Sequence, residues 1–255
     1  MLGRGTRHRG PAPQAVYPPR EDTALLLPFA HVRRGALVLD IGTGNGAIAE
    51  RAAERGARVV ATDLNRDALL GLARRARRSG RSIDCVRTDL AAGLRRFDRI
   101  LSNPPYLPTP EGAEDPDPWV DRALNGGPDG WSVTVRLLGS LASHLTPTGR
   151  AFVLISSLQE ERRGAALRIA WRRGGGSVRV VARRRLEGEE LRVWELRLEP
   201  ARRRVAPRTG RSPEGTGGRP RTRRRRRSAS NPATARGRTR APDAASARRR
   251  SPRGS

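Results

Sequence analysis

Short apolar runs alternate with stretches in which apolar residues recur every three or four positions, from about residue 21 to residue 199. The runs predict buried strands and the periodic stretches predict helices with one buried face. The predicted strands cover residues 37–40, 59–63, 83–88, 98–102 and 151–155. The predicted helices cover residues 22–31, 47–55, 66–78, 131–144 and a stretch ending near 171, and residues 107–129 are expected to form a long loop. Along the helix over 131–144 and into the next residue, the apolar positions expected on one face are Val135, Leu138, Leu141, Ala142 and Leu145. The alternation favours an α/β fold with helices on both faces of a sheet.

A glycine-rich segment follows the first predicted strand and opens the next helix. It reads Asp40-Ile41-Gly42-Thr43-Gly44-Asn45-Gly46, and glycines are needed where the backbone turns tightly and approaches a ligand closely. Asp63 ends the next strand, about 20 residues further on, where a carboxylate is placed to bind ribose hydroxyls. Gly-x-Gly-x-Gly with an acidic residue two positions earlier suits S-adenosylmethionine better than NAD, because the cationic sulfonium ligand carries no pyrophosphate.

The end of the predicted sheet differs from its beginning. Residues 178–182 and 191–198 read as strands separated by a short segment, which permits an antiparallel hairpin and excludes a parallel crossover. Five strands alternating with helices and finished by an antiparallel pair form the plan of the class I methyltransferase sheet. We therefore predict an α/β, Rossmann-like fold with a mostly parallel seven-stranded sheet and a C-terminal antiparallel hairpin.

Four residues after the strand over 98–102 predict the chemistry. An Asn103 side-chain oxygen and the Pro104 carbonyl at a strand end can accept the two hydrogens of a planar amino group. Pro105 lacks an N–H and has a fixed φ, which stiffens the loop, and the Tyr106 ring can pack on the flat face of that group. The predicted catalytic residues are Asn103, Pro104, Pro105 and Tyr106.

Charge is concentrated at the C-terminus. The 255-residue chain has a net charge of +27, and residues 201–255 contain 19 Arg but only Glu214 and Asp243 as acids, with no Leu, Ile or aromatic residue. Such a segment cannot bury enough apolar area to fold. We expect a flexible basic N-terminus over 1–15, one domain over 16–199 and a disordered Arg-rich tail over 200–255. The tail can bind phosphates, as in rRNA or the ribosome.

Other site classes find little support in the sequence. The single cysteine, Cys85, and the three scattered histidines, His8, His31 and His144, have no spacing suited to a metal. No apolar run approaches the roughly 20 residues of a membrane span, and no signal peptide is recognisable. We therefore expect a cytoplasmic protein without a metal site or a membrane partner.

Taken together, these motifs resemble the HemK-type family of protein-(glutamine) N-methyltransferases, which modify peptide-chain release factors. The resemblance covers most of residues 16–198, and the early glycine loop looks like the short archaeal and eukaryotic branch. One departure is Tyr17-Pro18-Pro19, where that branch often has Tyr-Glu-Pro. The resemblance rests on Tyr17–Thr23, Asp40–Gly46, Asp63, Thr88-Asp89-Leu90, Asn103–Tyr106 and the discriminating stretch Asp121–Gly130.

The resemblance implies S-adenosylmethionine as cofactor, with Asp63 on the ribose, Asp89 on the adenine amino group, and Asn103, Pro104 and Tyr106 on a glutamine amide. It also implies a release factor carrying Gly-Gly-Gln as substrate and a small zinc-binding activator subunit as a partner. The residues expected around the cofactor are Thr23, Asp40, Gly42, Gly44, Gly46, Asp63, Asp89, Leu90 and Asn103.

Two alternatives remain open on the sequence. A nucleic-acid methyltransferase acting on an exocyclic amino group of DNA adenine or rRNA needs the same clamp, and the positive charge favours it. The stretch Gly126–Gly130 and the lack of an added target-recognition domain oppose it. A non-catalytic basic binding protein, in which the fold only carries the cationic tail, would not need Asp40, Asp63 and Asn103, all of which are present. Lysine methylation is a lesser variant of the protein-substrate interpretation.

Overall fold

The structure is a computed structural model that describes residues 21–159 and 161–199. The predictions of a flexible N-terminus over 1–15 and a disordered tail over 200–255 lie outside the described residues. So do the first residues of the predicted domain over 16–199.

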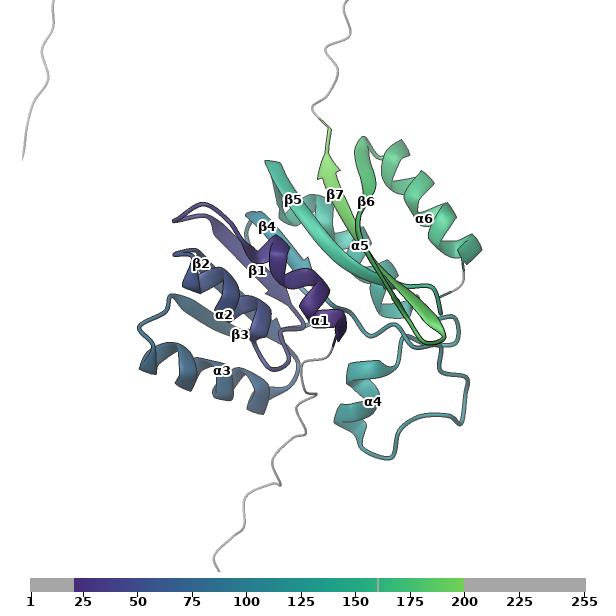
Figure 1. The fold of residues 1–255 in the computed structure, drawn as a ribbon, viewed down its shortest axis with the longest axis horizontal. Helices are drawn as coiled ribbons and strands as arrows, with labels where there is room; N and C mark the ends of the chain where they lie inside the picture. The colour runs from purple at the N-terminus through teal and green to yellow at the C-terminus, as the bar shows by residue number, and fades with distance from the viewer. Residues whose placement is uncertain (1–20, 160, 200–255) are drawn as a thin grey trace, which may run out of the picture. The chain divides into compact units, whose positions relative to one another are not determined.

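A seven-stranded sheet organises the described part of the chain. Its order is β3-β2-β1-β4-β5-β7-β6, so that β3 lies at one edge and β6 at the other (Figure 1). Strands β1 to β5 pair in parallel, whereas β7 is antiparallel to both of its neighbours. This confirms the predicted sheet and its C-terminal hairpin. The strands are β1 (Leu37–Ile41), β2 (Arg58–Asp63), β3 (Ile83–Arg87), β4 (Phe97–Ser102), β5 (Leu145–Ser156), β6 (Gly176–Leu186) and β7 (Glu189–Leu198).

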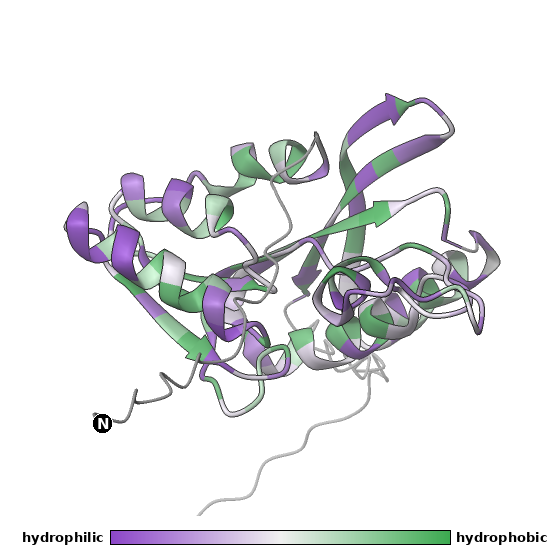
Figure 2. Cartoon of the chain, turned by 90° about the horizontal axis from the view of Figure 1, so that it is seen from below, coloured by the Kyte–Doolittle hydropathy of each residue, from purple (hydrophilic) through white to green (hydrophobic). Residues whose placement is uncertain are grey.

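Helices cover both faces of the sheet because successive strand residues point in opposite directions. In β1, Val38 is buried with residues of α1, α2 and α3, whereas Leu39 is buried with residues of α5 on the other face. Figure 2 shows hydrophobic and hydrophilic residues alternating along the helices on either side of the sheet. The helical segments are α1 (Glu21–Leu26), the 3-10 turn η1 (Leu27–Ala30), α2 (Ala47–Glu54), α3 (Arg66–Arg78), α4 (Pro118–Leu124), α5 (Ser132–His144) and α6 (Glu161–Arg173).

The strand predicted over 151–155 begins earlier, at Leu145, which was expected on the face of the preceding helix. Two other predicted elements differ from the structure for local reasons. The helix expected over 22–31 tightens into the 3-10 turn η1 at Leu27, where Pro28 supplies no backbone N–H. The prediction of a loop over 107–129 is wrong in part, because this segment contains α4. The Asp117 side chain caps this helix by accepting bonds from the backbone N–H groups of Trp119 and Val120, and Pro118 occupies its first turn, where proline is tolerated.

The predicted buried face of α5 is also partly wrong. Leu138 and Leu141 are buried as expected, whereas Ala142 is exposed, and Thr134 and Leu137 are buried in its place. Spacings of three, one and three residues place these four buried positions on one helical face. Among the described residues, no helix is both long and apolar enough to cross a membrane.

Candidate functional site

The glycine-rich segment and the segment Asn103–Tyr106 meet at the carboxyl ends of β1 and β4. These strands are parallel neighbours in which Ile41 pairs with Ser102, and the Ser102 hydroxyl donates to the Ile41 carbonyl at 2.9 Å. Gly42 and Asn103 therefore begin adjacent loops, although about 60 residues separate them in sequence. Ligands of open α/β sheets bind at this edge of the sheet, where the direction of strand order reverses.

Asp40 holds the glycine loop from behind. Its Oδ2 accepts bonds from the Thr43 hydroxyl at 2.7 Å and from the Ala49 backbone N–H at 3.1 Å. Its Oδ1 is buried and has no hydrogen-bond partner among the residues that the structure describes. Burial raises the pKa of Asp40 from 3.8 to about 7, because a carboxylate loses its hydration there. Asp40 thus ties the loop to the start of α2.

The glycines of the loop have backbone conformations that other residues rarely adopt. Gly42, Gly44 and Gly46 have φ values of 69°, 52° and 85°. The Gly44 N–H donates to Asp63 Oδ2 at 2.8 Å, and the other Asp63 oxygen accepts from the Asn65 N–H at 2.8 Å. The loop is therefore fixed to the end of β2 by the carboxylate predicted to bind ribose.

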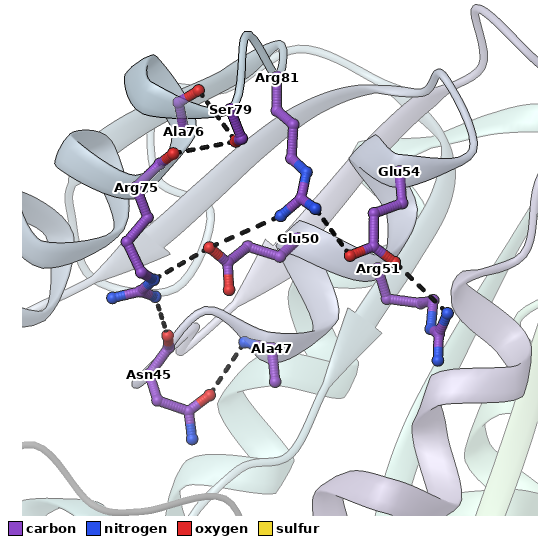
Figure 3. A network of polar contacts seen from close by, with 9 residues as sticks. All are labelled: Asn45, Ala47, Glu50, Arg51, Glu54, Arg75, Ala76, Ser79 and Arg81. Carbon is purple, nitrogen blue, oxygen red and sulfur yellow. Dashed lines mark hydrogen bonds and ion pairs between the residues drawn. The ribbon is translucent and has the colours of Figure 1, made fainter.

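A polar network on α2 and α3 holds the same loop from outside, as Figure 3 shows. The Arg75 guanidinium donates to the Asn45 carbonyl and to Glu50 Oε1, the latter at 2.9 Å. A Cβ on Gly46 would lie 2.6 Å from Leu72 Cδ1, so the absent side chain permits this close packing. Arg81, Glu54 and Arg51 extend the network along α2.

A cavity of about 220 Å³ opens over the glycine loop. Asp40 and Gly46 lie outside its wall, and Tyr106 borders a second cavity instead. The predicted residues that line the first cavity are Thr23, Gly42, Gly44, Asp63, Asp89, Leu90, Asn103, Pro104 and Pro105.

Helices α4 and α5 supply lining residues that the sequence analysis did not identify. Trp119 and Arg122 come from α4, and the Arg122 guanidinium lies 5.5 Å from the Trp119 ring centroid. Arg136 of α5 forms an ion pair with Asp89, so one oxygen of the predicted adenine-binding carboxylate already contacts a cation. The Asp117-Pro118 dipeptide, a helix-start signal, was the available hint that α4 exists.

A second cavity, of about 270 Å³, also has Asn103 in its wall. Asn103, Pro104 and Ala123 line both cavities. Two carboxylates, Asp22 and Glu189, and a group of leucines from α4, β6, β7 and the segment after Tyr106 line the second cavity alone. Of the four residues predicted to be catalytic, Asn103 and Pro104 are therefore common to both cavities.

Asn103 has an unusual hydrogen-bond state. Its side-chain Nδ2 donates to Asp22 Oδ2 at 3.0 Å, whereas its Oδ1 is buried and has no hydrogen-bond partner among residues 21–159 and 161–199. A buried acceptor without a partner costs about 1–3 kcal/mol. Asn103 Oδ1 can therefore accept a hydrogen from a ligand that enters between the cavities.

The turn at Gly126–Gly130 packs against the loop that carries Asn103. A Cβ on Gly130, which has φ +75°, would lie 2.4 Å from the Tyr106 carbonyl oxygen. The Gly126 N–H donates to the Leu107 carbonyl at 2.9 Å. Glycine is needed here because the two backbones touch, and the discriminating stretch of the sequence thereby supports the loop that is predicted to be catalytic.

The chain is similar to methyltransferases of the translation apparatus. The family described as methyltransferase small domain matches residues 21–114. A Methanocaldococcus jannaschii protein assigned as a protein N5-glutamine methyltransferase is 34% identical over 186 residues, which are 71% of this chain and 92% of the relative. The release factor glutamine methyltransferase of Deinococcus radiodurans is 39% identical over 60% of this chain, which spans only 58% of that relative.

A solved structure has a similar fold. The Encephalitozoon cuniculi Mtq2–Trm112 complex, responsible for methylation of the translation termination factor eRF1, includes a chain that superposes with a TM-score of 0.56 at 26% identity. The match covers 72% of this chain and 99% of that one.

Proposed function

Because this chain belongs to the family of protein N5-glutamine methyltransferases, we propose that it transfers a methyl group from S-adenosylmethionine to the side-chain amide nitrogen of a protein glutamine. The observation that carries this proposal is the buried Oδ1 of Asn103, which has no hydrogen-bond partner in the described part of the chain and belongs to a residue that lines both cavities. A cofactor on one side and an acceptor amide on the other would meet at that atom.

The chemistry of the first cavity suits S-adenosylmethionine. Gly42 and Gly44 carry no Cβ and leave room for the ligand, and the carboxylates of Asp63 and Asp89 can accept hydrogens from ribose hydroxyls and an adenine amino group. Asp40 and Gly46 would act on the cofactor through the shape of the loop. The further residues proposed to surround it are Thr23, Leu90 and Asn103. When bound, the cofactor supplies an activated methyl group.

The acceptor side needs alignment more than activation. An amide nitrogen is a poor nucleophile because its lone pair is delocalised into the carbonyl. If Asn103 Oδ1 and the Pro104 carbonyl accept its two hydrogens, electron density shifts toward the nitrogen and the lone pair points at the methyl group. Such positioning lowers the activation barrier by about 7–11 kcal/mol in favourable cases. The two acceptors stabilise the positive charge that develops on nitrogen, and the methylated nitrogen then becomes neutral by releasing one of its hydrogens as a proton to water. Pro105 stiffens the loop, and the Tyr106 ring would pack against the amide plane.

We further propose a peptide-chain release factor, methylated at the Gln of Gly-Gly-Gln, as the protein substrate. The names of the bacterial relatives and of the Encephalitozoon complex support this class of substrate. The second component of that complex supports a small activator subunit as partner. Two carboxylates beside the acceptor, Asp22 and Glu189, disfavour a phosphate-bearing nucleic acid there.

The test offers purified protein and labelled S-adenosylmethionine a release factor, its Gln→Ala variant and total RNA, each with and without a zinc-binding activator subunit. We expect label on the release factor that disappears with Gln→Ala. Label on RNA alone would overturn the proposal and give nucleic acid as the substrate.

Asn103→Ala tests the clamp itself. It removes the acceptor oxygen, so turnover should fall by at least about 100-fold, while the cofactor dissociation constant changes only a few-fold. Turnover near that of the wild type would rule out the amide clamp.

A further inference from the structure

The Asp22 carboxylate contacts residues that line both cavities. Asp22 lies in α1 and is only 9% exposed. Its Oδ2 accepts the Asn103 Nδ2 hydrogen at 3.0 Å, and its Oδ1 accepts the Thr23 backbone N–H at 2.6 Å and the Thr23 hydroxyl at 3.4 Å. Thr23 lines the first cavity, Asp22 the second, and Asn103 both.

This contact determines which end of the Asn103 amide faces the ligands. Only one of the two amide orientations places a donor against a carboxylate, because the other would oppose two oxygens at 3.0 Å. With Nδ2 held by Asp22, Oδ1 is left as the buried atom for which the described residues provide no hydrogen-bond partner. A charged acceptor on Nδ2 also polarises the amide, which makes Oδ1 a better acceptor.

We propose that Asp22 is a positioning residue for methyl transfer, which orients Asn103 so that its oxygen, not its nitrogen, faces the acceptor amide. This inference rests on the proposed function. Without the carboxylate the Asn103 amide can turn over, and its NH2 group would then oppose the hydrogens of the acceptor. The sequence separation of 81 residues means that α1 completes the site only by packing onto the sheet.

Three variants separate orientation from folding. Asp22→Ala removes the acceptor, and Asp22→Asn keeps one side-chain oxygen that can still face Asn103. Ala24→Gly loosens the same helix at an exposed position and leaves the carboxylate in place. We expect Asp22→Ala to lower kcat by about 100-fold with KM for S-adenosylmethionine changed less than threefold. Asp22→Asn should recover at least tenfold of that loss, and Ala24→Gly should retain the wild-type kcat.

A second measurement does not depend on activity. The Asn103 side-chain NH2 pair, identified in a ¹H–¹⁵N spectrum by its absence in Asn103→Ala, should exchange slowly with solvent in the wild type and rapidly in Asp22→Ala. If the wild type methylates no glutamine, the proposed function fails, and this exchange still decides the role of Asp22. The proposal would be overturned if the Asn103 NH2 exchange is unchanged in Asp22→Ala, or if the kcat of Asp22→Ala lies within threefold of the wild type. It would also be overturned if Asp22→Ala and Asp22→Asn lose kcat equally.

Discussion

Replacing Asp40 with asparagine exchanges a buried carboxyl in β1 for a neutral amide of the same shape. Asp40 is 1% exposed, and burial raises its pKa from 3.8 to about 7. The amide oxygen of the asparagine can accept both bonds that Oδ2 now accepts from Thr43 and Ala49. The substitution therefore removes the negative charge that Asp40 acquires as the pH rises through about 7 and keeps the contacts that hold the glycine loop.

The expected effect is a change in how stability depends on pH. The unfolded chain releases the Asp40 proton near pH 3.8, whereas the folded protein keeps it to about pH 7. The stabilisation that protonated Asp40 contributes to the folded state is thus complete below pH 3.8 and is lost as the pH rises to about 7. This window is worth about 4 kcal/mol at 1.4 kcal/mol per pH unit. About two-thirds of it lies above pH 5, so between pH 5 and pH 8 the wild type should lose about 3 kcal/mol relative to Asp40→Asn.

Urea unfolding at pH 5, 6, 7 and 8 measures this difference. A pH-independent free-energy cost of burying the asparagine NH2 group does not affect the result, because the readout is the slope of the unfolding free energy against pH. Asp84→Asn, which removes an exposed carboxylate from β3, is the matched control and should follow the wild type. A gap between wild type and Asp40→Asn that stays constant within about 0.5 kcal/mol over this range would refute the reasoning.

Two further substitutions test the supports of the site. Arg75→Met removes the guanidinium that binds the Asn45 carbonyl of the glycine loop and should weaken cofactor binding by about tenfold in calorimetry. Arg77→Met, at an exposed position of the same helix, should leave the affinity unchanged. Equal affinities of the two variants for the cofactor would contradict the role of Arg75 in holding the loop. Gly130→Ala introduces a Cβ 2.4 Å from the Tyr106 carbonyl oxygen at φ +75°, so kcat should fall by about 100-fold with cofactor affinity preserved. Gly139→Ala, in open space on α5, should remain active, and full activity of Gly130→Ala would show that this turn does not support the loop.

Local patterns predicted most of the sheet. The runs that became β1, β2 and β4 and the periodic stretch that became α3 were placed within a residue or two, because side-chain periodicity is set by backbone geometry alone. Helix α4 was missed because its seven residues are too few for a periodic pattern to emerge from a proline-rich segment. A capping signal was the only local evidence for it.

The predicted site residues were also brought to one place, with different tasks. Asp63 and Asn103 line the first cavity, whereas Asp40 lies behind the loop and Tyr106 borders the second cavity. The sequence predicts that a residue stands at the end of a strand, but not whether its side chain turns toward a ligand or into the core. Packing around each loop makes that choice.

The sequence by itself determined the chemistry available at the edge of the sheet: glycines that turn, carboxylates that accept, and an asparagine followed by two prolines. Only the tertiary structure decided which of these groups meet. The bond from Asn103 to Asp22 spans 81 residues, and the contact of Gly130 with Tyr106 joins two separate loops. Both contacts depend on strand order and helix packing, which arise from burial of the whole core, and no local stretch of sequence encodes them.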